Sequence, residues 1–286
     1  MVSESIVRTA QKSDQDAIQF FMDHAAAVHR HLDWRSPFDW FGNHNFLLSL
    51  QNDEIAGLLI CTAEPDEVSW VRIFGADRFS QIEKQWKFLF GQLIRQLQSQ
   101  KSTLTIASIA YFDWMKMLLT ENQWKVQQEV VQLNWVHNNL NKLDKKWPEE
   151  LSIRPMTYHD IKTVTKIDQD CFLFIWKQSQ DVIRRAFEQS SYTTVALLED
   201  EIVGFQISTS HKAIAHLARL AVQPKFQGQH IGQALVQNML RHYSRPWIHE
   251  ITVNTQHDNQ ISLSLYSKMG FEPTGERFPI FIYQTD

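Results

Sequence analysis

A strand, a polar loop and the start of a helix follow one another in the C-terminal half of the chain. The strand runs from His216 to Val222, Pro224 ends it, and a helix is predicted to begin near Gly232. Such a loop directs consecutive backbone N–H groups from the positive end of the helix dipole, which suits an anion. Gly228 and Gly232 would let the main chain approach a phosphate closely. The pattern indicates a phosphate-binding loop, although two glycines do not by themselves specify the ligand.

A second pattern follows about thirty residues later, after a predicted strand at 248–254. It places an Asn, a small residue, Leu-Tyr and Gly-Phe at fixed intervals within 259–271. Together the two segments resemble motifs A and B of the GNAT superfamily of acyl-CoA-dependent N-acyltransferases, with Gln227 and Gly232 at the first and last positions of motif A. The resemblance covers 151–286 and implies acetyl-CoA as the acyl donor and a primary amine as the acceptor.

The resemblance implies a site for coenzyme A on the strand, the loop and the second motif. The amides of 227–233 would hold the pyrophosphate, and Leu220 and Val222 would pair by main chain with the pantetheine arm. The implied cofactor-binding residues are Leu220, Ala221, Val222, Gln227, Gly228, Gln229, His230, Ile231, Gly232, Gln233, Asn259 and Tyr266. Asn259 has an equally simple alternative role, as the cap of the helix that carries Tyr266.

His230 occupies the position of the middle glycine of motif A. A non-glycine residue must then adopt the loop conformation, and histidine is among the residues least penalised at positive φ. Two roles stay open for its side chain: a solvated loop histidine or, when protonated, a contact to a phosphate.

Two residues are candidates for catalysis. The resemblance implies that Tyr266 protonates the departing thiolate; the alternative is a tyrosine packed between helix and sheet with its hydroxyl on a backbone acceptor. An alkylammonium acceptor, with a pKa of ~10, must lose a proton before it attacks, which requires a base. His216 is the candidate, because arylalkylamine acetyltransferases have a strand histidine at this distance from the same valine. Strand alternation would place His216 on one face with Leu220 and Val222; a purely structural histidine is the alternative.

Other groups near the predicted site have weaker indications. The backbone N–H of Val222 is implied as the oxyanion donor, and one such donor is worth ~3 kcal/mol. Asp168 and Asp170 lie where the acceptor side of such a fold is expected, so they are candidates for recognising a cation. Cys171 has no predicted activating base, so direct attack of the amine on acetyl-CoA is favoured over a cysteine route.

Composition argues against several other classes of protein. The chain has 286 residues, 43% hydrophobic and 21% charged, with a formal net charge of −4. These values are ordinary for a globular protein and give no electrostatic reason to expect nucleic acid or a membrane as partner. Cys61 and Cys171 form no Cys-x-x-Cys pair, so neither a disulfide framework nor a metal site is expected. Without an apolar run of ~18 residues or a leader-like N terminus, a cytoplasmic monomer or homodimer is predicted.

The two halves of the chain repeat one another. Residues 53–57 read Asp-Glu-Ile-Ala-Gly, and residues 200–204, 147 positions later, read Asp-Glu-Ile-Val-Gly. The same shift relates 70–74 to 217–221 and extends over about seventy positions without a gap. A shared register over this length predicts two copies of one fold.

Each half is predicted as an α/β fold of the layered α+β type, a GNAT fold with a mixed, mostly antiparallel twisted sheet flanked by helices. Apolar residues at helical spacing predict an amphipathic helix over 85–98, and the polar turn 199–201 predicts a hairpin. Polar residues within 138–150 mark the boundary, so the domains are predicted at 1–145 and 150–286.

The first half lacks the chemistry of the second. At the shift of 147, Gly232 corresponds to Gln85 and Tyr266 to Leu119, while Glu83 would place a carboxylate beside a pyrophosphate. The first domain is therefore predicted to be degenerate and without cofactor, and the second to be catalytic.

The main functional hypothesis is an acetyl-CoA-dependent N-acetyltransferase. A CoA-binding sensor or scaffold without turnover and an interaction protein without cofactor are the alternatives. The acceptor stays open among peptide N termini, lysines, polyamines, amino sugars and aminoacyl conjugates, because a fold does not choose among them.

Overall fold

The chain forms two compact units. The computed structural model describes residues 6–64, 68–99, 105–136 and 150–284. Unit 1 comprises residues 1–127 and 279–286, and unit 2 comprises residues 128–278. Most of the predicted boundary segment, 138–150, lies outside the described residues.

The two units differ from the predicted division because each sheet receives a strand from the other half of the chain. β7 (Lys125–Val136) follows the last helix of the first half but pairs with β12 (Glu250–Gln256) in unit 2. β13 (Glu272–Gln284) ends in unit 1, where it pairs with β6 (Thr105–Ile109). The sequence repeat does not reveal this exchange, since it records which residues form a strand and not which strand lies beside it.

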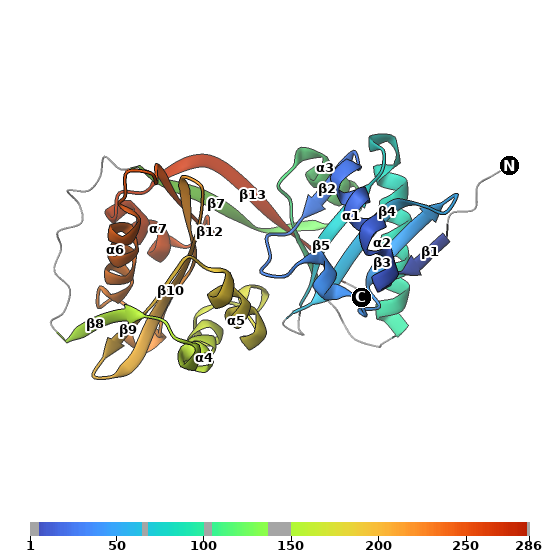
Figure 1. The fold of residues 1–286 in the computed structure, drawn as a ribbon. Helices are drawn as coiled ribbons and strands as arrows, with labels where there is room; N and C mark the ends of the chain where they lie inside the picture. The colour runs from blue at the N-terminus through green and yellow to red at the C-terminus, as the bar shows by residue number, and fades with distance from the viewer. Residues whose placement is uncertain (1–5, 65–67, 100–104, 137–149, 285–286) are drawn as a thin grey trace. The chain divides into compact units, whose positions relative to one another are not determined.

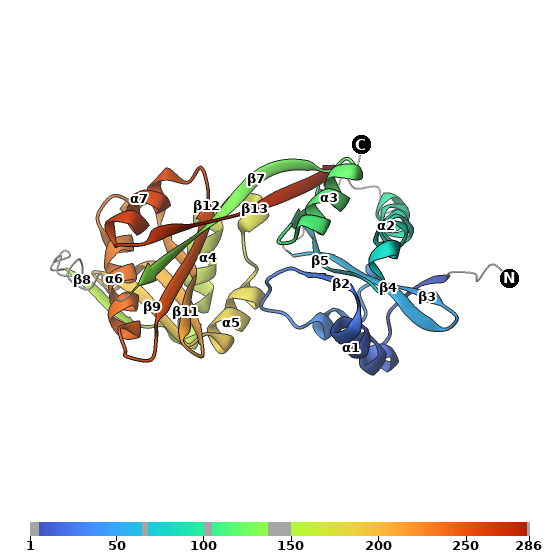
Figure 2. The ribbon, with the colours of Figure 1, turned by 90° about the horizontal axis from the view of Figure 1, so that it is seen from above.

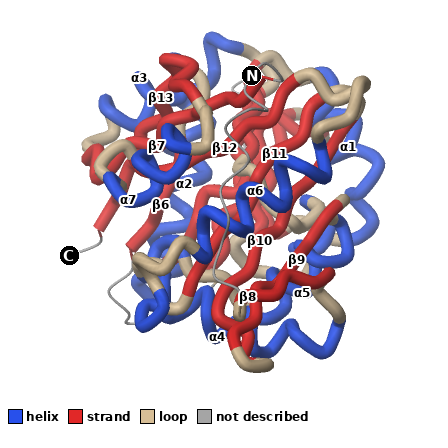
Figure 3. The backbone as a smooth tube through the Cα atoms, turned by 90° about the vertical axis from the view of Figure 1, so that its left-hand side faces the viewer, coloured by secondary structure: helices blue, strands red, loops and turns tan. Residues whose placement is uncertain are grey.

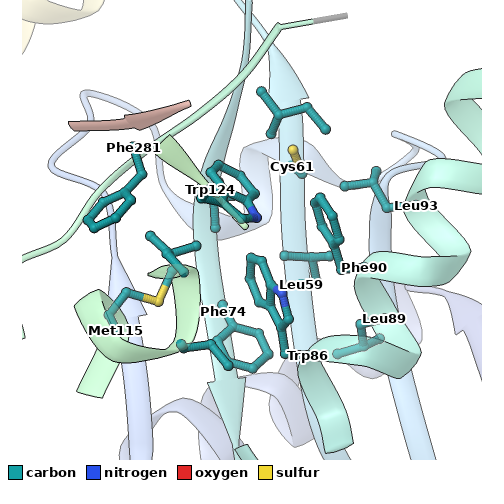
Figure 4. Packing of buried hydrophobic residues seen from close by; sticks show 14 of the residues in the cluster. Leu59, Cys61, Phe74, Trp86, Leu89, Phe90, Leu93, Met115, Trp124 and Phe281 are labelled. Atoms are coloured by element: carbon teal, nitrogen blue, oxygen red, sulfur yellow. The ribbon is translucent and has the colours of Figure 1, made fainter. Parts of the chain in front are cut away.

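Unit 1 is a mixed sheet between two helical layers, with strand order β1-β3-β4-β5-β6-β13. Helix α1 packs on one face, and α2 and α3 pack on the other (Figure 2). The largest core cluster stacks Trp86 on Phe90 and sets Phe74 edge-on to Trp86 (Figure 4). The other elements of unit 1 are β1 (Ile6–Thr9), α1 (Gln15–His24), β2 (Ala27–Arg30), β3 (Phe46–Gln51), β4 (Glu54–Ala63), β5 (Val68–Ala76), α2 (Ile82–Ser99) and α3 (Asp113–Glu121).

Unit 2 repeats this layered arrangement, with strand order β7-β12-β11-β10-β9-β8 and β13 beside β7. Helices α4 and α5 cover one face of its sheet, and α6 and α7 cover the other (Figure 1). Figure 3 shows α6 lying over the central strands, where it packs against β10 and β11. The remaining elements of unit 2 are β8 (Leu151–Pro155), α4 (Ile161–Cys171), α5 (Gln180–Gln189), β9 (Tyr192–Leu198), β10 (Glu201–His211), β11 (Ile214–Val222), α6 (Ile231–Tyr243) and α7 (Gln260–Lys268).

The repeated hairpin is confirmed in both units. Glu199 and Asp200 turn with φ of 46° and 67°, and Asn52 and Asp53 turn with φ of 51° and 64°. Two consecutive left-handed residues make a tight turn whose twist matches that of the flanking strands. The helix predicted over 85–98 is α2, three residues longer at its start and one at its end. In the described part of the chain, no helix is long and apolar enough to cross a membrane.

Candidate active site

The site begins where two parallel strands of unit 2 separate. β11 and β12 share four residue pairs, of which the last joins Leu217 to Val253, and both strands then continue without pairing to each other. On its other side β11 stays paired with β10 as far as Val222. The edge of 218–222 that faces away from β10 therefore has no strand partner among the described residues. We call this space between β11 and β12 the gap.

A β-bulge at Ala218 decides how side chains are arranged beside the gap. Leu217 and Arg219 pair with consecutive residues of β10, which leaves Ala218 as the extra residue. One extra residue reverses the alternation of side chains, so His216 and Leu220 point to opposite faces of the sheet. Leu220 packs toward α6, and His216 lies on the other face. The predicted shared face of these two residues is wrong, because alternation was counted through the bulge.

The main chain of β11 presents its polar groups to the gap at alternate residues. The amide of Gln223 donates to the carbonyl of Val203 in β10 at 2.8 Å. By alternation along the antiparallel ladder, the N–H and C=O groups of Leu220 and Val222 point away from β10. These two residues have the position that main-chain pairing with an extended ligand requires.

The loop after β11 leads to a helix N terminus that no side chain caps. Gly228 has φ of 80°, and His230 has φ of 63°, the left-handed conformation that its place in the motif requires. His230 is the N-cap residue of α6; its side chain caps no backbone amide, and its Nδ1 lies 3.3 Å from Oε1 of Gln233. The amides of 231–233 have no acceptor within the helix, so they remain available to an anion.

Gly232 of unit 2 and Gln85 of unit 1 occupy equivalent positions with different surroundings. A Cβ at Gly232 would come no closer than 3.5 Å, to Leu265, which is an ordinary contact. The corresponding Gln85 of unit 1 is buried, and its side chain lies against Gly57 and Ser49. Unit 1 therefore has a buried polar side chain at the position where unit 2 has a glycine.

In unit 1 a strand occupies the place that corresponds to the gap, beside the strand edge of β5 that β6 leaves unpaired. β5 pairs in parallel with β6 only as far as Trp70. The rest of that edge of β5 pairs with β2 through four residue pairs, the first of which joins Ala76 to Ala27. The equivalent segment of unit 2, which follows α4, is the 3₁₀ turn η6 (Phe174–Trp176), and no described pairing joins it to β11. The edge that is open in unit 2 is thus occupied in unit 1.

Tyr266 lies in α7, which begins with a capped turn. The side-chain oxygen of Asn259 accepts a hydrogen bond from the amide of Ser262 at 3.1 Å, so the capping role of Asn259 is observed. Tyr266 is 5% exposed and packs against Phe271, and its hydroxyl makes no hydrogen bond to any residue that the structure describes. Burial raises the pKa of Tyr266, so the phenol is protonated at neutral pH.

His216 has a defined hydrogen-bond partner and a free ring nitrogen. Its Nδ1 lies 2.8 Å from the hydroxyl oxygen of Thr252, and that hydroxyl lies 3.4 Å from the carbonyl oxygen of Ala215. When the Thr252 hydroxyl donates to Ala215, it accepts from Nδ1–H of His216, and the lone pair of His216 is on Nε2, the tautomer that a base at Nε2 requires. Burial lowers the pKa of His216, which keeps the imidazole neutral and able to take a proton at neutral pH.

The lowered pKa of His216 predicts an acid limb in the pH profile. As pH falls through this pKa, below 6.5, the imidazole gains a proton, and kcat/KM for the amine should fall about tenfold per pH unit. His216→Gln should lower kcat/KM about 100-fold near pH 7.5 and remove that limb. Initial rates from pH 5 to 9 measure both effects. An unchanged acid limb in His216→Gln would exclude His216 as the base.

Asp168 is held in a buried ion pair. Its carboxylate accepts from Arg219 Nε at 2.6 Å and from the amide of Gln178 at 2.9 Å, and the Asp168 side chain is 0% exposed. Arg219 also donates to the carbonyl of Trp176 and lies over the ring of Phe172 at 3.5 Å. The expectation that Asp168 recognises a cationic acceptor is wrong, because its carboxylate is buried and is neutralised by the guanidinium of Arg219.

Cys171 lies next to the gap but is a poor nucleophile. Its Sγ–H donates to the carbonyl of Val222 at 3.1 Å, and Gln227 donates to the same oxygen at 2.9 Å. Burial, with the nearby Asp168 and Asp170, raises the pKa of Cys171 to about 11. The thiol is therefore protonated at neutral pH. Among the described residues, no group of three or more His, Cys, Asp and Glu side chains is placed to hold a metal ion.

Residues 161–271 match the acetyltransferase (GNAT) family. The whole chain is similar in structure to a GCN5-related N-acetyltransferase from Sphaerobacter thermophilus, with 15% identity and a TM-score of 0.63, over 98% of this chain and 95% of that one. It is also similar to a tandem GNAT protein from the clavulanic acid biosynthesis pathway, with 14% identity and a TM-score of 0.66, over 99% and 100%. At these identities the likeness shows the fold, and it confirms the predicted tandem arrangement of two α/β units.

Proposed function

We propose that this chain, whose residues 161–271 belong to the GNAT acetyltransferase family within a tandem GNAT fold, transfers an acetyl group from acetyl-CoA to a primary amine in unit 2. The observation that carries the proposal is the unpaired edge of 218–222, which leads through a short loop to the uncapped first turn of α6. An extended amide-containing arm that ends in a pyrophosphate matches an open strand edge followed by free helix amides.

In this proposal each catalytic step is assigned to a residue of unit 2. The main chain of Leu220 would hold the pantetheine arm, the amides of 231–233 would hold the pyrophosphate, and the N–H of Val222, whose carbonyl already accepts from Cys171 and Gln227, would stabilise the oxyanion. His216 Nε2 takes a proton from the ammonium group of the acceptor, and the freed nitrogen attacks the thioester carbonyl. A C–N bond forms, the C–S bond breaks, Tyr266 protonates the leaving thiolate, and the second proton that the nitrogen loses restores the phenol.

We propose that unit 1 binds no cofactor, so the chain binds one acetyl-CoA. Strand β2 occupies the strand edge that unit 2 leaves open, and unit 1 has Gln85 where the motif has Gly232. Isothermal titration should therefore give one site per chain, and Gly232→Glu should weaken binding more than about 100-fold, because it adds a carboxylate to the helix turn whose amides would hold the pyrophosphate. Glu83→Gln, at the corresponding region of unit 1, should leave the Kd unchanged. Two sites per chain would contradict the assignment of unit 1.

Release of free coenzyme A thiol with a panel of primary amines tests the transferase itself. Turnover with at least one amine is expected, and mass spectrometry should show that the amine gains an acetyl group. Tight binding of acetyl-CoA with no thiol release on any amine would instead identify a sensor. Cys61 and Cys171 are both free thiols, which fits the reducing cytoplasm that we propose as its location.

A further inference from the structure

One face of the unit 2 sheet is polar beside the gap. Along β7 and β12, alternate residues belong to the apolar core under α6 and α7: Leu133, Trp135, Ile251 and Val253. By strand alternation the residues between them face the opposite side. These are Gln132, Asn134, Thr252 and Asn254, which we call the polar patch.

The polar patch is a compact block next to the candidate base. Asn254 lies opposite Gln132, and Thr252 lies opposite Asn134. Cβ atoms of such cross-strand pairs are ~4.5–5.5 Å apart. Thr252 is also the hydrogen-bond partner of His216, so a ligand on this block would be within reach of the imidazole.

Asn254 has an unused hydrogen-bond acceptor at the mouth of the gap. It directly follows Val253, the last residue of β12 that pairs with β11. Its side-chain oxygen Oδ1 is buried and accepts no hydrogen bond from any described residue. A buried acceptor without a donor is unfavourable, whereas a ligand that brings an N–H group to this point would satisfy it.

The four side chains of the polar patch are uncharged and can both donate and accept hydrogen bonds. Amide and hydroxyl side chains both donate and accept hydrogen bonds, which matches hydroxyl groups that do the same. One carboxylate borders the patch: Glu250 shares its face of β12, keeps its charge and accepts from Asn134 at 3.3 Å, whereas Asp168 is paired with Arg219. No aromatic residue belongs to the patch.

We propose, resting on the transferase function proposed above, that the polar patch binds the acceptor, that Asn254 Oδ1 accepts from the attacking amine, and that the acceptor is a hydroxylated small amine such as an amino sugar. The amine then has two fixed partners. One N–H donates to Asn254, and the proton that leaves goes to His216.

Glucosamine, spermidine and phenylethylamine serve as probes of the three acceptor chemistries. With saturating acetyl-CoA, glucosamine should have a kcat/KM at least about tenfold above that of either other amine. Asn254→Leu should raise the KM for glucosamine about tenfold or more, because one hydrogen bond is lost, while the Kd for acetyl-CoA stays within about twofold. Asn254→Asp keeps an acceptor oxygen in place and should keep that KM within about threefold.

Thr255→Val is the matched control, since Thr255 is the next residue of β12 and lies on the other face; it should leave the KM for glucosamine unchanged. Equal KM values for wild type and Asn254→Leu would overturn the role of Asn254. A preference for spermidine or phenylethylamine would overturn the acceptor class and leave the transferase intact. Acetyl-CoA binding without turnover of any amine would reject the transferase, and this inference with it.

Discussion

Replacement of Tyr266 by phenylalanine should lower kcat by about 10²–10³-fold and leave the Kd for acetyl-CoA within about twofold. Tyr266 carries its proton at neutral pH, and burial raises its pKa further, which makes it a weaker acid toward the thiolate without removing the proton that it would supply. The ring stays in place in the variant and keeps its contact with Phe271. Only the step in which the C–S bond breaks loses its acid. Stopped-flow detection of the free thiol, compared with titration of acetyl-CoA, separates the two quantities.

The matched control for Tyr266→Phe is Tyr243→Phe. Tyr243 belongs to the same core cluster, but unlike that of Tyr266 its hydroxyl has a hydrogen-bond partner, Ser208 Oγ at 3.3 Å. Its loss should change stability slightly and leave kcat near the wild-type value. A kcat for Tyr266→Phe within threefold of wild type would remove Tyr266 as the general acid and favour a solvent-derived proton.

Replacement of Asp168 by alanine should lower the free energy of unfolding by about 3–5 kcal/mol, because it leaves the Arg219 guanidinium buried without its anion. The Arg219 side chain is 14% exposed, so water cannot replace the carboxylate fully. Urea denaturation followed by circular dichroism measures the change. The double variant Asp168→Leu with Arg219→Met removes both charges and should recover most of the loss.

An ion pair on the surface of α5 is the control for Asp168→Ala. Asp181 contacts Arg184 and Arg185 on α5, where all three side chains are partly exposed. Asp181→Ala should therefore cost less than about 1 kcal/mol. A loss of similar size for Asp168→Ala and Asp181→Ala would show that the Asp168 pair contributes no more than a solvated one.

The sequence predicted most of the chemistry of the loop and little of the geometry around it. Motif spacing placed Gly228, His230 and Gly232 in a loop before a helix, because glycine requirements and helix starts are local properties. The pairing of Asp168 with Arg219 was missed, since the two residues are fifty-one positions apart and nothing local marks them as partners.

The β-bulge at Ala218 and the pairing of β2 with β5 could not be predicted from the sequence. The bulge at Ala218 depends on how β10 pairs, and alanine fits a strand with or without a bulge. Strand β2 is only four residues long, Ala27–Arg30, and its composition does not say that it fills the space between β5 and β6. Both are outcomes of tertiary pairing, which local propensity does not determine.

The exchange of β7 and β13 makes the two halves of the chain depend on each other for complete sheets. Residues 128–136 of β7 are encoded with the first half and complete the sheet of unit 2, so deletion of the first half would expose the edge of β12. An exposed edge of this kind invites aggregation. The first half is in this sense a strand donor to unit 2, so its removal should disturb unit 2 whether or not unit 1 binds a ligand.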